Sequence, residues 1–193
     1  MKIICVENAF VDDKLPFAIK PASALLLPHN PFFFPDFTKS ITARMGVVVR
    51  INKPGRSIAA KFAPQHYDSF AVALDIVASD LLSFCVDKGL PLDLATSFDS
   101  SFPVSKFLKM SDMENPFEEI SFSWQVDGVE QDNSRISQLK PRFDEAVEAV
   151  SQYVTLREGD YIFVPSSKAC DIQMGNRVEL KMNCQTALRF NVR

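Results

Sequence analysis

The run Phe70-Ala71-Val72-Ala73-Leu74-Asp75-Ile76-Val77 decides the fold, because it is apolar at every position except Asp75. A short, uninterrupted apolar run that is rich in β-branched residues is typical of a strand buried on both faces. An ionised carboxylate within such a strand is costly unless a cation or a metal ion neutralises it. The sequence therefore predicts a buried strand over Tyr67–Val77 and a functional role, or the remnant of one, for Asp75.

The segment Ile41–Ile51 predicts a second strand, because its apolar content rises toward its end before a proline and a glycine mark a turn. Since the side chains of a strand alternate between its two faces, Thr42, Arg44 and Gly46 share one face. An arginine that points inward needs a carboxylate partner, and we hypothesise that Arg44 pairs with Asp75. The alternative is an arginine that faces solvent from an edge strand.

Elsewhere the pattern is that of strands joined by turns, with few helices. An Asp-Gly pair is the signal of a type I′ turn and predicts a hairpin over Ile120–Gln131, where polar and apolar residues alternate. Helical spacing predicts a helix over Arg142–Val154, and a second helix, capped by Ser79 or Asp80, ends at Gly89. Further strands are expected to end at Val6 and to cover Ala24–Leu27, Tyr161–Val164 and Val178–Val192. The predicted class is a strongly β α+β fold with a few short helices.

Length and charge exclude several classes of protein. The chain has 193 residues, and we expect a single domain over residues 1–193. Its 21 lysines and arginines are outnumbered by 24 aspartates and glutamates, and the cations are scattered, which argues against a nucleic-acid surface. No apolar run approaches the ~20 residues of a membrane span, and the first residues do not form a secretory signal. We therefore expect a cytoplasmic protein that binds neither nucleic acid nor membrane.

The sequence carries none of the common catalytic motifs. The 4 cysteines are widely spaced without a C-x-x-C pair, and 2 histidines are too few for the usual zinc sites. A glycine-rich phosphate loop, a serine nucleophile elbow and an H-E-x-x-H motif are all absent. Any chemistry must therefore depend on buried polar residues such as Asp75.

Two loops carry side chains whose role the residues leave open. The segment Gln131-Asp132-Asn133-Ser134 could supply amide donors to a ligand, or it could form a plain turn. The phenylalanine-rich segment Pro31–Pro35 is interpreted as a loop that packs its rings beneath a neighbouring element. The alternative is an exposed apolar surface for a protein partner.

Several segments, in their order and spacing, are similar to those of one known family. They are Met1–Val6, Lys20–Leu25, Phe34–Phe37, Lys61–Ala63, Leu74–Leu81, Lys88–Pro91 and Leu156–Phe163. Together they resemble the fumarylacetoacetate hydrolase superfamily, whose members act on 2-oxo acids, diketo acids and related dioate substrates. The resemblance covers nearly the whole chain, and it implies a mixed β-roll or sandwich with a few short helices and a homodimer.

The resemblance also implies a Mg²⁺ or Mn²⁺ centre, made by a Glu-x-Glu strand pair and an aspartate, that binds the substrate's 2-oxo-carboxylate. In this chain the glutamate pair falls on Arg44 and Gly46, and only the third ligand position is retained, as Asp75. Three carboxylates would offer the ion a charge of −3, whereas the charges of these three residues cancel. We therefore expect no metal cofactor and hypothesise that Arg44 replaces the ion as a fixed cation beside Asp75.

Other functional positions of the family are altered in this chain. The family's lysine falls on Thr96, although the nearby Phe98-Asp99 pair is retained, and its catalytic histidine falls near Asp13. Gln131 and Asn133 loosely match a Gln-x-x-Asn-like stretch of the family. The resemblance therefore adds Thr96, Gln131 and Asn133 to the candidate substrate-binding residues.

Two functions are compatible with these residues. The first is that of a catalytically degenerate family member, a pseudoenzyme that keeps the fold and binds a small carboxylate or 2-oxo acid at Arg44 without metal. The alternative is an active hydrolase, isomerase or decarboxylase of a 2-oxo or diketo acid, similar to a 2-hydroxyhepta-2,4-diene-1,7-dioate isomerase. In that case Arg44 would hold the carboxylate and stabilise an oxyanion, and Asp13, Asp75 or Asp99 would act as the base.

Overall fold

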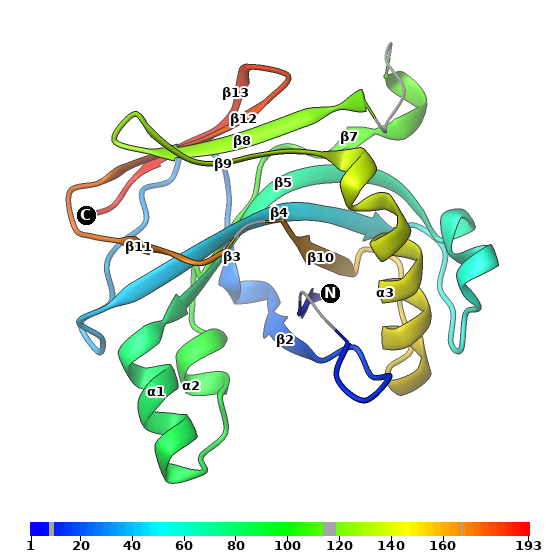
Figure 1. Cartoon of the computed structure of the whole chain (residues 1–193), viewed down its shortest axis with the longest axis horizontal. Helices are drawn as coiled ribbons and strands as arrows, with labels where there is room; N and C mark the ends of the chain where they lie inside the picture. The colour runs from blue at the N-terminus through cyan, green and yellow to red at the C-terminus, as the bar shows by residue number, and fades with distance from the viewer. Residues whose placement is uncertain (8–9, 114–118, 167) are drawn as a thin grey trace.

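The two apolar runs of the sequence form the long central strands β4 (Ile41–Ile51) and β5 (Tyr67–Ala78), as predicted. The computed structural model describes residues 1–7, 10–113, 119–166 and 168–193, and β4 and β5 pair antiparallel at its centre (Figure 1). On its other side β4 pairs with β10 (Tyr161–Pro165), so β4 is an interior strand. The other strands of this sheet are β1 (Lys2–Val6), β2 (Phe17–Pro21), β7 (Leu108–Lys109) and β11 (Cys170–Ile172).

A smaller antiparallel sheet lies over β4 and β5 (Figure 1). The predicted hairpin is confirmed, because Asp127 and Gly128 have φ angles of 50° and 82°, as a type I′ turn requires. The strands are β8 (Ser121–Val126), β9 (Val129–Arg135), β12 (Arg177–Met182) and β13 (Gln185–Asn191). Apolar side chains of β8, β12 and β13 join those of β4 and β5 in the main core. The two sheets thus form the strongly β, sandwich-like arrangement that the sequence predicted.

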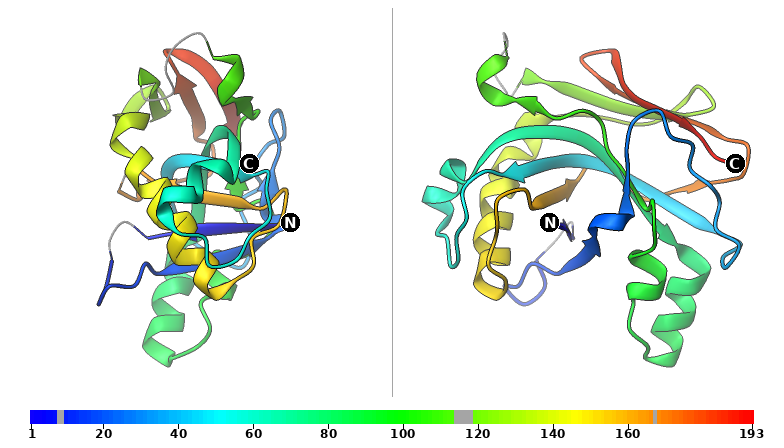
Figure 2. Two further views of the ribbon diagram at one scale, coloured as in Figure 1. Left: turned by 90° about the vertical axis from the view of Figure 1, so that its right-hand side faces the viewer. Right: turned by 180° about the vertical axis from the view of Figure 1, so that it is seen from behind.

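Helices lie toward opposite ends of the central strands (Figures 1 and 2). The predicted helix near the C-terminal half is α3 (Lys140–Tyr153), and its apolar face is buried against the core. The chain leaves β5 directly into α1 (Ser79–Lys88), which ends at Gly89 with a φ of 63°, and α2 (Asp93–Thr96) follows. Among the described residues, no helix is long and apolar enough to span a bilayer. The short elements are β3 (Leu25–Leu26), β6 (Phe102–Pro103) and the 3-10 turns η1 (Ala22–Ala24), η2 (Ala60–Gln65), η3 (Met110–Asp112) and η5 (Ile136–Gln138).

The two faces of β4 and β5 differ in what they bury. One face, with residues such as Val47 and Val72, contributes to the main core. The opposite face buries a smaller cluster that includes Val48, Ala73 and the Phe163 ring. Because side chains alternate along a strand, this second face is the one that also carries Arg44 and Asp75.

The structure corrects two local expectations and adds one strand that the sequence did not indicate. The strand expected over Ala24–Leu27 is reduced to Leu25–Leu26, because Ala24 belongs to a 3-10 turn, and β2 was not anticipated. Neither proposed residue caps α1; its N-cap is Ala78, and Asp80 instead accepts hydrogen bonds from the Thr38 hydroxyl and from the Lys39 amide.

The phenylalanine-rich segment Pro31–Pro35 packs one of its rings beneath a neighbouring element, as interpreted from the sequence. Phe32 is fully buried in the main core, and its ring lies 6.4 Å from that of Phe190. Phe33 is 67% exposed, so part of the segment's apolar surface faces solvent.

The smaller sheet carries a polar network on its outer face around Glu179. This carboxylate accepts hydrogen bonds from the Thr186 hydroxyl, from Arg189 Nη2 at 2.7 Å and from Gln125 Nε2 at 2.7 Å. The Thr186 hydrogen bond, with that of Arg189, lowers the pKa of Glu179 from 4.5 to about 2. A carboxylate with a lowered pKa in the folded state stabilises that state above its unfolded pKa and loses this effect as the pH falls toward 2.

We therefore expect Glu179→Gln to lower the thermal unfolding midpoint at pH 7. The variant should also lose less of its stability than the wild type between pH 5 and pH 2.5, because the proton uptake of this group is removed. Thermal unfolding followed by circular dichroism across this range measures both effects, with Glu130→Gln on exposed β9 as the control. Parallel stability curves for Glu179→Gln and the wild type would contradict this assignment.

Candidate functional site

The register of the central strands places Arg44 directly opposite Asp75. Directly opposite residues of an antiparallel pair have neighbouring side chains on the same face of the sheet. Arg44 Nε donates to Asp75 Oδ2 at 3.0 Å, so the hypothesised pair forms. The alternative of a solvent-facing arginine on an edge strand is wrong, because β4 lies between β10 and β5 and the Arg44 side chain is only 17% exposed.

The other edge of the Arg44 guanidinium holds a second carboxylate, that of Glu7. Arg44 Nη1 lies 2.7 Å from Glu7 Oε2, and Nη2 lies 2.9 Å from Oε1, a bidentate arrangement. Glu7 follows β1 directly, and its amide donates to the carbonyl of Pro16 at 2.9 Å. Burial opposes the charge of Arg44, but the hydrogen bonds to Glu7 and the charge of Asp75 outweigh it and raise the pKa of Arg44 above its usual range.

A second cation, Lys20 of β2, neutralises the remaining oxygen of Asp75. Its Nζ lies 2.8 Å from Asp75 Oδ1 and donates to the carbonyls of Ile76 at 2.8 Å and Ser101 at 3.2 Å. The side chains of Lys20 and Asp75 are 1% and 3% exposed. Breaking such a buried pair by removing one partner costs about 3 to 5 kcal/mol. Lys20 and Asp75 are therefore a permanent part of the site.

A cavity of about 440 Å³ lies beside these four charged side chains. Its polar lining is completed by Thr42 and Thr96, and its cations and anions balance, since Arg44 and Lys20 face the carboxylates of Glu7 and Asp75. The apolar part of the lining comes from β2, β4, β5, the α1–α2 region and the segment before β11: Ala18, Ala43, Val77, Leu82, Val86, Leu92 and Ala169.

The residues around Asp75 do not fit a divalent cation. Arg44 and Lys20 already engage the two oxygens of Asp75. Gly46, which the sequence resemblance also assigned to a ligand position, does not line the cavity, and a Cβ atom there would lie 2.3 Å from the carbonyl oxygen of Val164 and 2.7 Å from the Phe163 ring. In the part of the chain that the structure describes, no group of three histidine, cysteine, aspartate or glutamate side chains could hold a metal ion.

The structure brings some of the sequence-derived candidates together and separates the others. Arg44, Asp75 and Thr96 line the same cavity. Asp13 lies at a different hollow, beside α3, and Asp99 is exposed outside the described lining.

The two amide candidates lie on the smaller sheet rather than at the cavity. Gln131 and Asn133 are exposed residues of β9, and Asn133 is opposite Ser123 of β8. Gln131 Oε1 accepts a hydrogen bond from Cys170 Sγ, with 3.0 Å between the two atoms.

Sequence reasoning missed Glu7 and Lys20 as members of the site. The signal for Lys20 was a lone lysine in the otherwise apolar stretch around β2, and for Glu7 a carboxylate directly after an apolar strand. Cys5 is also close by, but burial, together with the charge of Asp75, raises the pKa of its thiol well above the usual value. Cys5 is therefore a neutral core residue and not a thiolate nucleophile.

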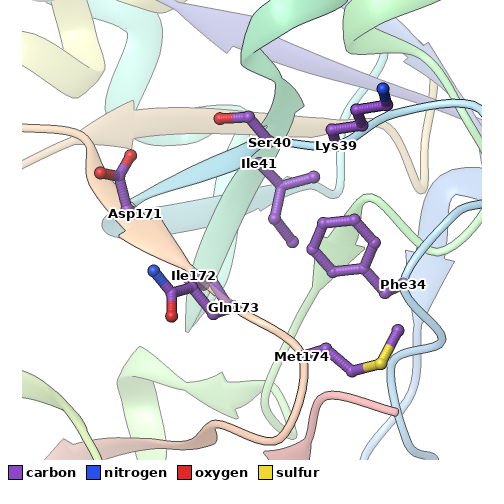
Figure 3. Close-up of a pocket in the computed structure, with 8 residues that line it drawn as sticks. All are labelled: Phe34, Lys39, Ser40, Ile41, Asp171, Ile172, Gln173 and Met174. Carbon is purple, nitrogen blue, oxygen red and sulfur yellow. The ribbon is translucent and has the colours of Figure 1, made fainter.

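A second hollow lies at the start of β4, as Figure 3 shows. Its apolar side chains Phe34, Ile41 and Met174 point toward one another, whereas the ammonium group of Lys39 points away from them. Unlike the Arg44 cavity, this hollow has no convergent set of buried charges. The Arg44 cavity is therefore the candidate functional site.

Comparison with known proteins places the chain in a family. A family model described as "Fumarylacetoacetate (FAA) hydrolase C-terminal" matches residues 7–193. The chain belongs to the fumarylacetoacetate hydrolase family. This confirms the resemblance inferred from the sequence segments.

Curated relatives and solved structures are similar to this protein over most of its chain. "Oxaloacetate tautomerase FAHD1, mitochondrial" of Mus musculus is 27% identical over 176 residues, which cover 91% of this chain and 79% of the relative. The crystal structure of fumarylpyruvate hydrolase from Pseudomonas aeruginosa, in complex with Mn²⁺ and pyruvate, is 25% identical with a TM-score of 0.86, and the match covers 100% of this chain and 89% of that one. A 2-hydroxyhepta-2,4-diene-1,7-dioate isomerase from Mycobacterium marinum shares the fold at 21% identity, with a TM-score of 0.82 over 99% of this chain and 73% of the other.

The tight contact at Gly46 leads to a stability prediction for this family member. Gly46→Ala should destabilise the fold by about 1 to 3 kcal/mol, because its Cβ would overlap the carbonyl of Val164 and the Phe163 ring. Chemical denaturation measures the change. Thr42→Ala, four residues earlier on the same face and partly exposed, is the control and should cost less. A Gly46→Ala protein as stable as the wild type would contradict the close packing at this position.

Proposed function

We propose that this member of the fumarylacetoacetate hydrolase family works without a metal ion, binds a small carboxylate at Arg44 and lacks metal-assisted turnover. The observation that carries the proposal is the distance of 3.0 Å between Arg44 Nε and Asp75 Oδ2. It puts a fixed positive charge beside the one retained ligand position of the family's metal centre. The proposal therefore treats Arg44 as a structural replacement for the ion.

Electrostatics supports the loss of the metal. A guanidinium about 4 Å from a divalent cation repels it by roughly 8 kcal/mol at an effective dielectric constant near 20. Even millimolar binding supplies only about −4 kcal/mol. Glu7, Asp75, Arg44 and Lys20 also have no net charge together, so the site offers a cation no electrostatic attraction that would offset this repulsion.

The carboxylate-binding part of the proposal is supported by the guanidinium itself. Arg44 already binds one carboxylate in bidentate geometry through Nη1 and Nη2, which is the arrangement that arginine offers to carboxylate ligands. Arg44 and Glu7 both line a cavity of about 440 Å³, so a ligand carboxylate bound to Arg44 would have both a partner and space.

The relatives define the competing function, an active tautomerase or hydrolase of a small oxo acid. Oxaloacetate tautomerase and fumarylpyruvate hydrolase are the activities named for the two similar proteins above. Without a metal, such an activity in this chain would need Arg44 to stabilise the developing oxyanion and a carboxylate such as Glu7 to transfer the proton. Two experiments separate this function from the proposed one.

The first experiment measures metal binding. We expect millimolar Mg²⁺ or Mn²⁺ to leave the thermal unfolding midpoint unchanged, whereas a site filled at about 100 times its Kd would raise it by roughly 5 to 10 °C. The fumarylpyruvate hydrolase of Pseudomonas aeruginosa, whose structure contains Mn²⁺, is the positive control. A clear shift in this protein that disappears in Asp75→Asn would mean that a metal site exists and would overturn the proposal.

The second experiment measures turnover. We expect no detectable consumption of fumarylpyruvate and no acceleration of oxaloacetate tautomerisation when absorbance is followed with and without Mn²⁺. The physical reason is that the site lacks the Lewis acid that would polarise the substrate carbonyl. Turnover that is lost in Arg44→Met would establish the enzymatic function instead.

A further inference from the structure

We propose that the Arg44 cavity selects a straight-chain monocarboxylate with an apolar tail, and that the ligand's carboxylate takes the place of Glu7 on Arg44. This inference rests on the proposed carboxylate site and adds the class of ligand and the group that it displaces. It differs from the dioate substrates that the family resemblance implies. Three features of the site carry it: unequal burial, charge balance and an apolar wall.

The two carboxylates on Arg44 differ in burial. Asp75 is 3% exposed, whereas the Glu7 side chain is 47% exposed. The Glu7–Arg44 contacts are part-buried, and an ion pair that solvent reaches is less costly to break than one that solvent does not reach. Asp75 also holds Lys20 at 2.8 Å, so its release would leave two cations without their main anion. Glu7 is therefore the exchangeable carboxylate, and Asp75 is the permanent one.

Exchange of Glu7 for a monocarboxylate preserves the charge balance of the site. The incoming carboxylate binds Nη1 and Nη2 of Arg44, where Glu7 was bound, and Glu7 moves into solvent, where water satisfies its charge. Arg44 stays paired on both edges throughout, because its Nε contact with Asp75 is retained. A ligand with one negative charge thus replaces one negative charge.

A second carboxylate on the ligand would find no cation. In the lining that the structure describes, the cations are Arg44 and Lys20, and Lys20 is already committed to Asp75. Away from the charged residues the wall is apolar, with Val77 of β5, Leu82 and Val86 of α1, and Leu92 before α2. A second carboxylate placed against this wall would meet no cation, and it would cover apolar surface less well than a methyl group would. The wall therefore disfavours dioates and favours an apolar chain.

The apolar wall also leaves surface for a ligand tail to cover. Val86 is 62% exposed and Leu92 is 45% exposed, although both line the cavity. The cavity volume of about 440 Å³ corresponds to on the order of ten or more non-hydrogen atoms, at roughly 30 Å³ per water-sized group. Acetate or pyruvate would fill only part of it, whereas a chain of medium length would also cover these side chains.

The test is a calorimetric titration of the protein with acetate, butanoate, hexanoate and hexanedioate. Each added methylene that reaches the wall should tighten binding by about fourfold. Hexanedioate should bind at least about tenfold more weakly than hexanoate, because its second charge is unpaired. This comparison needs no substitution, so it does not depend on the folding of any variant. Equal or tighter binding of hexanedioate would overturn the proposed ligand class.

Three variants locate the ligand on the residues named. Arg44→Met should abolish binding of every carboxylate in the series. Glu7→Gln should tighten binding of hexanoate and acetate alike by about two- to fivefold, because the competing charge is removed. Val86→Ser should weaken hexanoate several-fold and leave acetate unchanged. Val129→Ser is the matched control at 63% exposure on β9 and should change neither.

The outcomes separate the two proposals. Weaker or unchanged binding in Glu7→Gln would overturn the displacement of Glu7, and an unchanged hexanoate affinity in Val86→Ser would overturn the role of the wall. In either case, binding that still depends on Arg44 would leave the proposed function standing. If none of the carboxylates binds the wild type, both the proposed function and this inference are overturned.

Discussion

A carboxylate buried in the middle of a central strand must be neutralised, and Asp75 imposes this requirement on the whole structure. Arg44 on the neighbouring strand forms an ion pair with one oxygen of Asp75, and Lys20 on β2 forms an ion pair with the other. The position of β2 is therefore tied to β5, although the two strands are not hydrogen-bonded neighbours in the sheet. Loss of either cation would leave a buried charge with one partner, so the same interactions stabilise the fold and form the site.

The family fold is present over residues 7–193 of the chain. The site at its centre is built from Arg44, Asp75, Lys20 and Glu7, whose charges cancel. Gly46, further along β4, does not line this cavity and is packed against Phe163 and the Val164 carbonyl. Because one fold can support different chemistries, the function has to be argued from the residues of the site itself.

Burial gives the carboxylates of this site different roles. Glu7 and Asp75 contact the same guanidinium, but solvent reaches Glu7 and is excluded from Asp75. The buried carboxylate holds Nε of the arginine, and the more exposed one holds Nη1 and Nη2. An arginine held in this way is pre-organised, so a ligand carboxylate would not have to order it first.

The sequence by itself determined the central strands, the β8–β9 hairpin and α3, because these features depend on local periodicity and on turn chemistry. It also suggested the pairing of Arg44 with Asp75, because a buried charge needs a partner, but the register of β4 against β5 decided between this pair and a solvent-facing arginine. Only the tertiary structure decided that Lys20 and Glu7 complete the site, because both lie far from Asp75 in the chain and β2 is a short strand without a clear alternation. It likewise separated Gln131, Asn133 and Asp99 from the cavity, since the pairing of distant strands, which local pattern does not specify, sets which polar side chains meet.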